Sequence, residues 1–293
     1  MKIGFVGLGT MGAPMAINLL KAGFGLKVFD IEPGSDRVKR VVEHGAKLTE
    51  KPRDVAKGSE VILLSLPNAS ASEQAMLGEE GILQATSPGS VVIELSTVSP
   101  STVRKIANSA EPLGIDILDA PVSGGKSGAE SATLTIMVGG KREVFDRSMN
   151  IFKSIGKNIF YVGGLGSGEV VKLLNNMLVL IDLVTAQSVL EIAVKAGVDL
   201  RLLHSIINAS TGQSWNWTNW IPKILDRQNV GSTPDIFNKD MTEALKMAEE
   251  LKISPETAKA ALKIVRSYVE KNQGKLDMSA MFDFLPGRVH SNK

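Results

Sequence analysis

The chain opens with Met1-Lys-Ile-Gly-Phe-Val-Gly7-Leu-Gly9-Thr-Met-Gly12, and the helix-forming run 13–22 follows at once. An apolar run that leads into glycines predicts a buried strand, a tight turn and the start of a helix. The spacing G-x-G-x-x-G is the dinucleotide-binding fingerprint: Gly7 permits the turn, Gly9 the close approach of a pyrophosphate, and Gly12 the packing of helix on strand. We therefore expect cofactor contacts from Gly7, Leu8, Gly9, Thr10, Met11 and Gly12.

A second apolar stretch, Leu26-Lys-Val-Phe-Asp30, ends in an acid 18 residues after Gly12. This is about the distance expected for a carboxylate that accepts hydrogen bonds from the ribose hydroxyls. Because Asp30 would repel a 2′-phosphate, it favours NAD over NADP. Arg37 lies close enough along the chain to swing back toward a 2′-phosphate, so NADP remains the alternative.

Composition narrows the class of protein. The chain has 293 residues, 43% of them hydrophobic, and a net charge of +2 from 33 basic and 31 acidic residues, which argues against a nucleic-acid partner. It has no cysteine, so disulfides and thiolate chemistry are excluded. The first strand begins at residue 2 and no uncharged apolar run reaches 18 residues, which predicts a cytoplasmic protein without a signal peptide or a membrane span.

Up to residue 162, short apolar runs alternate with amphipathic runs, the pattern of a parallel sheet covered by helices. After it the strand pattern stops, and a long helix is predicted over 167–195 with an apolar middle that suggests burial between domains or subunits, hence a homo-oligomer, dimer or tetramer. The prediction is an α/β protein with a Rossmann domain over 1–162, then a long interdomain helix and an all-helical C-terminal domain over 163–293. Further strands are predicted over 61–66, 90–95, 115–119, 133–138 and 158–162, and further helices over 200–209, 215–225, 239–251 and 255–271.

Polar residues follow several of these strands. In an open parallel sheet the carboxyl ends of the strands line the ligand crevice, so Leu66-Pro67-Asn68 and Thr97 are expected to contact the cofactor. For Asn68 and Thr97, a turn residue that bonds its own backbone is an equally good interpretation.

The turn Gly163-Gly-Leu-Gly166-Ser-Gly168 precedes the long helix, and Lys172 and Asn176 project from one face of that helix. Near a helix N-terminus and beside an oxidised nicotinamide, a lysine would lose its proton more readily, which suits an acid/base group next to a hydride transfer. The alternative is a solvated lysine, but the glycines suggest a backbone that a ligand approaches closely.

Histidine and metal chemistry are less favoured. His44 ends a surface helix, His290 lies in a polar tail, and His204 is interpreted as a residue between helices. The sequence contains no cluster of histidines or carboxylates with metal-ligand spacing. This leaves metal-free chemistry based on a lysine.

Four motifs in order resemble the β-hydroxyacid dehydrogenase family over the whole chain. They are the fingerprint at Gly7, the segment Asp119-Ala-Pro-Val-Ser-Gly-Gly125 with Ala129 after it, the run from Gly163 through Lys172 to Asn176, and Lys239-Asp240.

The resemblance implies a role for each motif. Ser123, Gly124 and Gly125 would bind the substrate carboxylate, through a hydroxyl and exposed amides. Lys172 corresponds to the family's catalytic lysine and Asn176 to an asparagine that positions substrate. Lys239 corresponds to a residue that closes over the cofactor, with Asp240 supporting it.

One departure from the family pattern lies before Lys239. Relatives place an aromatic residue some six positions ahead of the Lys-Asp pair within a longer loop, whereas here Pro234-Asp-Ile-Phe237-Asn238 leads almost directly into it. Trp215 is expected to fill part of the substrate pocket, and Trp217 and Trp220 either join it or pack between helices.

These observations predict an NAD-dependent oxidoreductase that interconverts a small 3-hydroxy acid, similar to 3-hydroxyisobutyrate, and its semialdehyde. The first alternative is an NADPH-dependent reductase of glyoxylate, succinic semialdehyde or tartronate semialdehyde. The second is a catalytically silent dinucleotide-binding protein on the same fold. The Lys172/Asn176 pair favours an enzyme over a silent protein.

Overall fold

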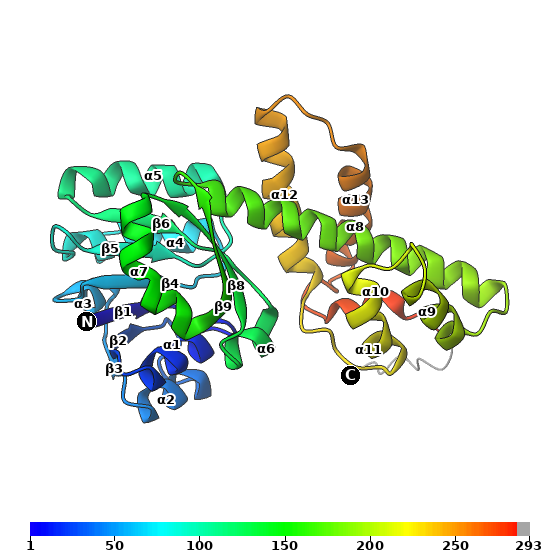
Figure 1. The fold of residues 1–293 in the computed structure, drawn as a ribbon, viewed down its shortest axis with the longest axis horizontal. Helices are drawn as coiled ribbons and strands as arrows, with labels where there is room; N and C mark the ends of the chain where they lie inside the picture. Colours follow the sequence, from blue (N-terminus) through cyan, green and yellow to red (C-terminus); the bar gives the residue numbers. More distant parts are fainter. Residues whose placement is uncertain (286–293) are drawn as a thin grey trace. The chain divides into compact units, whose positions relative to one another are not determined.

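Nine strands of the N-terminal half form one sheet in the computed structural model, which describes residues 1–285 (Figure 1). The chain divides into two units, one ending at Lys172 and one beginning at Leu173. The strand order is β3-β2-β1-β4-β5-β6-β8-β7, and β9 pairs with β8. Since β1 has β2 on one side and β4 on the other, both parallel, the strand order reverses beside β1, where open α/β sheets bind ligands. The strands are β1 Lys2–Val6, β2 Gly25–Phe29, β3 Lys47–Leu48, β4 Val61–Leu64, β5 Val91–Glu94, β6 Asp116–Asp119, β7 Val122–Ser123, β8 Leu134–Gly140 and β9 Gly156–Gly163.

The expectation of a fully parallel sheet is wrong at one edge. Strand β8 runs antiparallel to β6 and to β7, and only β9 is parallel to it. The chain between β6 and β8 holds only the short strand β7 and the six-residue helix α6 (Gly125–Glu130). Strand β7 follows β6 after two residues and also pairs with β8, so 116–123 and β8 form an antiparallel hairpin whose connection contains α6.

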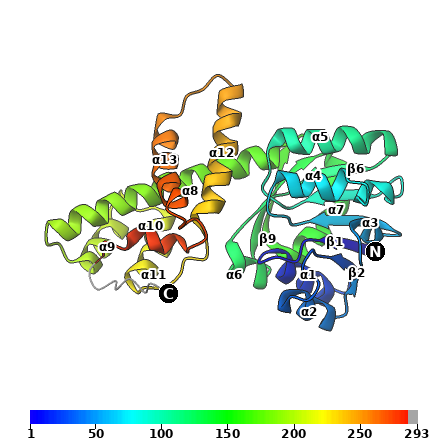
Figure 2. The same ribbon diagram turned by 180° about the vertical axis from the view of Figure 1, so that it is seen from behind.

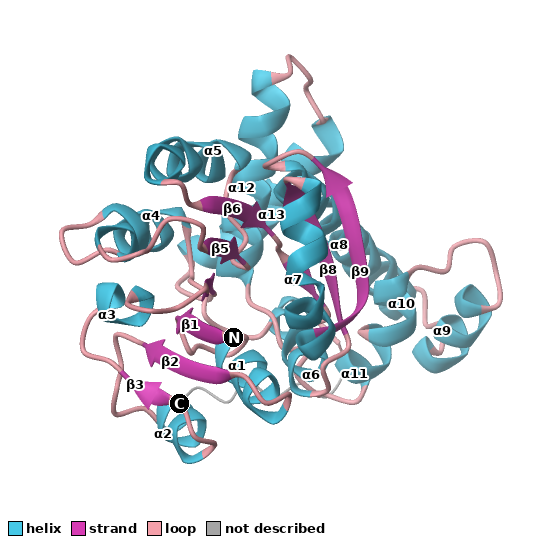
Figure 3. Ribbon diagram, turned by 60° about the vertical axis from the view of Figure 1, so that its left-hand side comes forward, coloured by secondary structure: helices cyan, strands magenta, loops and turns pink. Residues whose placement is uncertain are grey.

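Two apolar cores cover the two faces of the sheet, and Figure 3 shows the helices that lie on either side of it. Successive strand residues point to opposite faces, so Phe5 packs in one core and Val6 in the other. On one face lie α1 Gly12–Lys21, α2 Asp36–Glu43 and α7 Arg142–Ile155; on the other lie α3 Pro52–Ala56, α4 Ala69–Leu77 and α5 Pro100–Ala110.

Helix α8 (Ser167–Lys195) begins in the first unit and continues into the second, which is helical throughout its described residues. The core of the second unit includes Leu183 and Leu190 of α8 and, near the end of the described chain, Phe282 and Leu285. Helices α12 and α13 lie side by side (Figures 1 and 2). The remaining helices are α9 Leu200–Asn208, α10 Trp215–Asn219, α11 Ile221–Leu225, α12 Pro234–Glu250 and α13 Glu256–Glu270, with a 3-10 helix at Met278–Phe282.

Helix α8 begins and ends at the predicted residues, but two other helices differ from the prediction. The helix predicted over 215–225 breaks at Trp220 into α10 and α11, because Pro222 lacks the N–H that a continuous helix would use. Helix α12 begins at Pro234, five residues before Lys239, because Thr233 caps it and its hydroxyl accepts from the amide of Ile236 at 3.4 Å.

By length and composition α8 is also apolar enough to cross a membrane, the one such helix among residues 1–285. Its most apolar 18-residue window has a mean hydropathy of 1.9, and 33% of that window is buried. A core helix of a soluble protein meets the same criterion, and Leu180, Leu183 and Leu190 are fully buried in the second unit.

Candidate active site

The three fingerprint glycines meet three different surroundings. Gly7 has a φ of 91°, and a Cβ there would lie 2.3 Å from the Ser65 carbonyl oxygen. A Cβ on Gly12 would lie 1.9 Å from the Gly7 carbonyl oxygen, so this glycine lets α1 pack on the turn. A Cβ on Gly9 would meet nothing within 4 Å. The space beside Gly9 is what a pyrophosphate needs to approach the backbone, so the turn fits the phosphates of a dinucleotide.

The start of α1 is open to an anion. Within the described part of the chain, no side chain caps α1 and its first turn holds no acidic residue. The amide N–H groups of that turn and the positive end of the helix dipole therefore attract a phosphate. Thr10 and Met11 lie in the loop immediately before α1, which begins at Gly12.

Asp30, just after β2, is held against the fingerprint. One carboxylate oxygen accepts a hydrogen bond from the amide of Leu8 at 2.6 Å, and the other accepts from the amide of Glu32 at 2.8 Å. Arg37 is paired with Glu32, its guanidinium 3.2 Å from the carboxylate. The base that would favour NADP therefore has an acidic partner, and the segment after β2 carries two carboxylates, Asp30 and Glu32.

Polar groups also gather where β4 and β5 end. The amide of Leu66 donates to the Ser96 hydroxyl at 2.7 Å, and Pro67 and Asn68 follow at the surface. The Asn68 side chain accepts from the amide of Ala71 at 2.9 Å and caps α4, so it is a turn and cap residue. Thr97 is half-buried after β5.

Two buried acids at the ends of neighbouring strands were not predicted from the sequence as site residues. Glu94, the last residue of β5, accepts from the amide of Ser96 at 3.0 Å. Asp119, the last residue of β6, is fully buried and accepts from the amides of Gly166 at 2.7 Å and Glu169 at 2.9 Å. Burial raises the pKa of Asp119 above its ordinary value, and the backbone hydrogen bonds oppose this rise. The signal in the sequence is an acid that closes an otherwise apolar strand.

Most of the glycines before α8 are required by the backbone conformation or by close packing. Gly163 and Gly166 have φ of 134° and 92°, and a Cβ on Gly168 would lie 2.3 Å from the Met137 carbonyl oxygen. Gly164 alone has open space around it. Backbone conformation and packing explain three of the four glycines, so the turn as a whole does not indicate an approaching ligand.

Lys172 is 8% exposed in the second turn of α8, which excludes a solvated lysine. The helix start that carries it is bonded to the carboxyl end of β6 through Asp119. A buried amine at the ligand edge of the sheet is the kind of group that serves in acid/base chemistry.

Ser123, Gly124 and Gly125 form a turn beside the fingerprint helix. Ser123 pairs with β8, and the two glycines are exposed with φ of 132° and 62°. The amide of Asn18 on α1 donates to the Ala129 carbonyl oxygen on α6 at 2.7 Å. The helices that follow the fingerprint and this turn are thus in contact, and the two exposed glycines suit a carboxylate.

In the second unit, Asp240 bridges two of the predicted site residues. It is 3% exposed, and its carboxylate accepts from the Asn176 amide at 2.6 Å and lies 2.9 Å from the Lys239 ammonium. The Asn176 oxygen in turn accepts from the Asn175 amide at 3.0 Å. The predicted support of Lys239 by Asp240 is therefore present as an ion pair.

The three tryptophans have different environments. Trp215 is 60% exposed and meets Trp220 edge to face, with ring centroids 5.9 Å apart. Trp217 is buried in the core of the second unit, and its indole N–H donates to the His204 carbonyl oxygen at 3.2 Å. A ring nitrogen of His204 lies 3.0 Å from the Trp217 carbonyl oxygen, so both residues pack between α9 and α10.

Metal and histidine sites do not appear in residues 1–285. No group of three or more histidines, aspartates or glutamates in this part of the chain could hold a metal ion. His44 contacts the Arg40 carbonyl oxygen at 2.7 Å on the surface of α2, and His290 lies outside the described residues.

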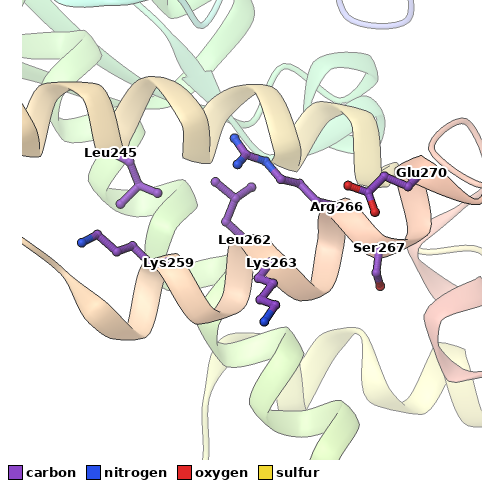
Figure 4. A pocket seen from close by; sticks show the side chains of 7 residues that line it. All are labelled: Leu245, Lys259, Leu262, Lys263, Arg266, Ser267 and Glu270. Atoms are coloured by element: carbon purple, nitrogen blue, oxygen red, sulfur yellow. The ribbon is translucent and has the colours of Figure 1, made fainter.

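A surface hollow between α12 and α13 contains none of the predicted site residues (Figure 4). Within it the Arg266 guanidinium donates to Asn238 and Thr242, each at 3.2 Å, and Lys259 pairs with Glu256 at 3.0 Å. The hollow is lined by Leu245, Lys259, Leu262, Lys263, Arg266, Ser267 and Glu270.

Comparison with known proteins agrees with the geometry. Residues 2–163 match the family model for the NAD binding domain of 6-phosphogluconate dehydrogenase, and residues 166–285 match the model described as NAD-binding of NADP-dependent 3-hydroxyisobutyrate dehydrogenase. The 2-(hydroxymethyl)glutarate dehydrogenase of Eubacterium barkeri is 39% identical, over 96% of this chain and 93% of its own length. The NAD-dependent L-serine dehydrogenase of Pseudomonas aeruginosa is 36% identical, over 89% and 86% of the two chains.

A solved structure has the same fold over almost the whole chain. The 3-hydroxyisobutyrate dehydrogenase of Mycobacterium tuberculosis with L-serine superposes with a TM-score of 0.88 at 27% identity, covering 97% of this chain and 99% of that one. Together with the two family models, these matches show that the chain belongs to the β-hydroxyacid dehydrogenase family and is an NAD(P)-dependent oxidoreductase acting on the CH–OH group of a hydroxy acid.

Proposed function

We propose that the enzyme oxidises the primary hydroxyl of an acid HOCH2–CHR–COO⁻ to the semialdehyde, with NAD as the cofactor. The relatives support this substrate class, because 2-(hydroxymethyl)glutarate, 3-hydroxyisobutyrate and L-serine, taken from their names, are all 3-hydroxy acids of this form. They differ only in the group R on the central carbon. The constant parts are the carboxylate and the hydroxyl, and these are the parts the site must recognise.

Lys172 is the proposed general acid/base, and its burial at the start of α8 is the observation that carries the proposal. In oxidation it takes the hydroxyl proton, and in reduction it returns a proton to the carbonyl oxygen. When bound, the oxidised nicotinamide accepts the hydride from the carbinol carbon. The carbinol hydroxyl must therefore lie within hydrogen-bond reach of the Lys172 nitrogen.

Ser123, Gly124 and Gly125 are proposed to bind the carboxylate through the Ser123 hydroxyl and the two glycine amides. The exposure of the two glycines and the contact of the following helix α6 with α1 support this role. Asn176 is proposed to position the substrate from the next helical turn after Lys172. Trp215, which is exposed, is proposed to contact R, and Lys239 to contact the cofactor.

We propose that the enzyme prefers NAD over NADP because of the charges of Asp30, Glu32 and Arg37. Asp30 is fixed beside the fingerprint by the Leu8 amide, and Glu32 engages Arg37. An added 2′-phosphate would meet two carboxylates and an arginine whose charge is already paired. We also propose a cytoplasmic homo-oligomer in which 1–162 form the cofactor domain and 163–293 the interdomain helix and the helical domain.

The test is a panel of 3-hydroxy acids with NAD and with NADP, followed at the nicotinamide absorbance. The panel holds 3-hydroxypropionate, 3-hydroxyisobutyrate, L-serine and 2-(hydroxymethyl)glutarate, each with its methyl ester. We expect turnover of at least one free acid and a much higher KM for its ester, because the ester leaves the carboxylate donors without an anion. Esters that turn over as well as the acids would contradict the carboxylate site.

Ser123→Ala sharpens this test. The variant removes one donor without disturbing Gly124, whose φ of 132° makes any side chain there strained. We expect KM for the acid to rise about tenfold, which corresponds to about 1.4 kcal/mol, with unchanged affinity for NADH. Ser127→Ala, on the adjoining helix α6, is the matched control.

A further inference from the structure

The first turn of α8 is capped from a distant part of the chain. A helix leaves its first amide N–H groups without partners inside the helix, and a neighbouring Ser, Thr, Asp or Asn usually accepts one of them. Here the acceptor of the Glu169 amide is Asp119, 50 positions earlier, at the end of β6. The second oxygen of the same carboxylate accepts from Gly166, so one buried side chain holds two points of the helix start.

We propose that Asp119 is the positioning residue for Lys172: its carboxylate fixes the start of α8 to the end of β6 and thereby sets where the lysine nitrogen lies. The inference rests on the acid/base role proposed for Lys172. Lys172 is three residues beyond Glu169, about 4.5 Å along the helix axis at 1.5 Å per residue. A shift of the Glu169 amide is therefore passed to Lys172 almost undiminished.

Three further contacts support this anchoring. The Glu169 carboxylate, itself fully buried, accepts from the amide of Val98 at 3.2 Å, so the same helical turn is also bonded to the loop after β5. A Cβ on Gly168 would lie 2.8 Å from one Asp119 oxygen, and a Cβ on Gly139 would lie 2.5 Å from the other. Glycine at both positions thus leaves room for the carboxylate beside the start of α8.

The test is Asp119→Asn. Asparagine has one oxygen and an NH2 group, so at most one of the two amides keeps an acceptor. We expect kcat to fall between about tenfold and a hundredfold, because proton transfer depends on placement within about 1 Å. The dissociation constant of NADH should stay within about twofold, and KM for the acid should change less than kcat, since the proposed carboxylate site at Ser123 does not depend on the lysine nitrogen. Hydrogen exchange of the backbone amides in 163–172 should become at least about tenfold faster.

Asp116→Asn is the matched control, at the other end of the same strand. It weakens the ion pairs with Lys141 at 2.8 Å and Arg147 at 2.6 Å and should leave kcat and the exchange of 163–172 unchanged. If Asp119→Asn does not fold, Asp119→Glu decides, because it keeps the charge and moves the carboxylate by one methylene group. It should show the same fall in kcat.

The outcomes separate this inference from the proposed function. A folded Asp119→Asn protein with wild-type kcat, or with unchanged exchange over 163–172, overturns the positioning role. A loss confined to KM also overturns it, because the residue would then serve substrate binding. If the wild-type protein oxidises no acid of the panel, the proposed function fails, and the exchange measurement alone decides whether Asp119 holds α8.

Discussion

The turns 7–12 and 163–168 are both rich in glycine and both lead into a helix. The two helix starts differ in whether a side chain already accepts hydrogen bonds from their amides. At the first, Gly9 has open space and no side chain in the described chain caps α1. At the second, the buried Asp119 already accepts from two amides. The start of α1 is therefore available to a ligand, whereas two amides at the start of α8 are already bonded to Asp119. A glycine-rich turn before a helix indicates an anion site only where no acceptor from elsewhere in the fold fills it.

The largest expected effect is the loss of turnover when Lys172, which follows the turn 163–168, is replaced. Cofactor binding at the turn 7–12 should not change. Lys172→Ala should lower kcat by at least about a hundredfold, the scale of a lost acid/base group, and leave NADH affinity nearly intact. Lys172→Arg should lower kcat as well, because a guanidinium does not give up its proton at working pH. For each variant, steady-state kinetics measure kcat and a titration of NADH fluorescence measures the affinity for NADH. Lys195→Ala, at the exposed end of the same helix, is the control; near wild-type turnover in Lys172→Ala would refute the assignment.

The next prediction compares two glycines that both have open space. Gly9→Val should keep its melting temperature but weaken NADH binding at least about tenfold, equal to about 1.4 kcal/mol, because the side chain fills the space a pyrophosphate needs. Gly164→Val should also fold and should keep its NADH affinity. Fluorescence titration distinguishes the two. Equal losses in both variants would mean that the second turn also binds the cofactor.

Asp30 tests how the first turn selects its cofactor. The unmodified enzyme should prefer NAD in kcat/KM, and Asp30→Ala should narrow that preference by about tenfold, or about 1.4 kcal/mol, chiefly by admitting NADP. Some loss with NAD is also expected, because the Leu8 amide loses its acceptor. Asp36→Ala, a nearby exposed acid on α2, is the control. A wild-type preference for NADP would show that Arg37 dominates.

The smallest effect concerns stability at the second turn. Because burial raises the pKa of Asp119, the folded protein holds that proton more tightly than the unfolded chain. The stability gained from this is complete below the unfolded pKa near 4 and is lost as the pH rises through the raised folded pKa. The melting temperature of wild type minus that of Asp119→Asn should therefore fall as the pH rises above about 4 and then level off. A difference independent of pH would contradict this.

Local signals predict much of the fold and of the candidate site. The glycine fingerprint and the acid at position 30 follow from short-range spacing, and the structure places Asp30 against Leu8. The bounds of α8 follow from a long run without proline that is preceded by glycines. The direction of β8 was not predictable, because apolar residues alternate in the same way in parallel and antiparallel strands.

The cap on α8 could not be read from the sequence either. Asp119 meets Glu169 only because the sheet order brings the end of β6 to the start of α8, and no spacing rule spans 50 residues. Helix-start rules search the neighbouring residues, and for α12 they would have found Thr233. The role proposed for Ser123 came from the family resemblance alone, whereas the role proposed for Lys172 was also indicated by its place near a helix start.

The place of Phe282 and Leu285 in the second core has a consequence for synthesis on the ribosome. The first unit has all its strands once Gly163 has been made, whereas the second lacks two core side chains until its last described residues. At about 5–20 residues per second, Leu285 is added of the order of ten seconds after Lys172. During that time the core around α8 lacks these two side chains, and a stop codon shortly before Phe282 should destabilise the second unit while leaving every strand of the first in place.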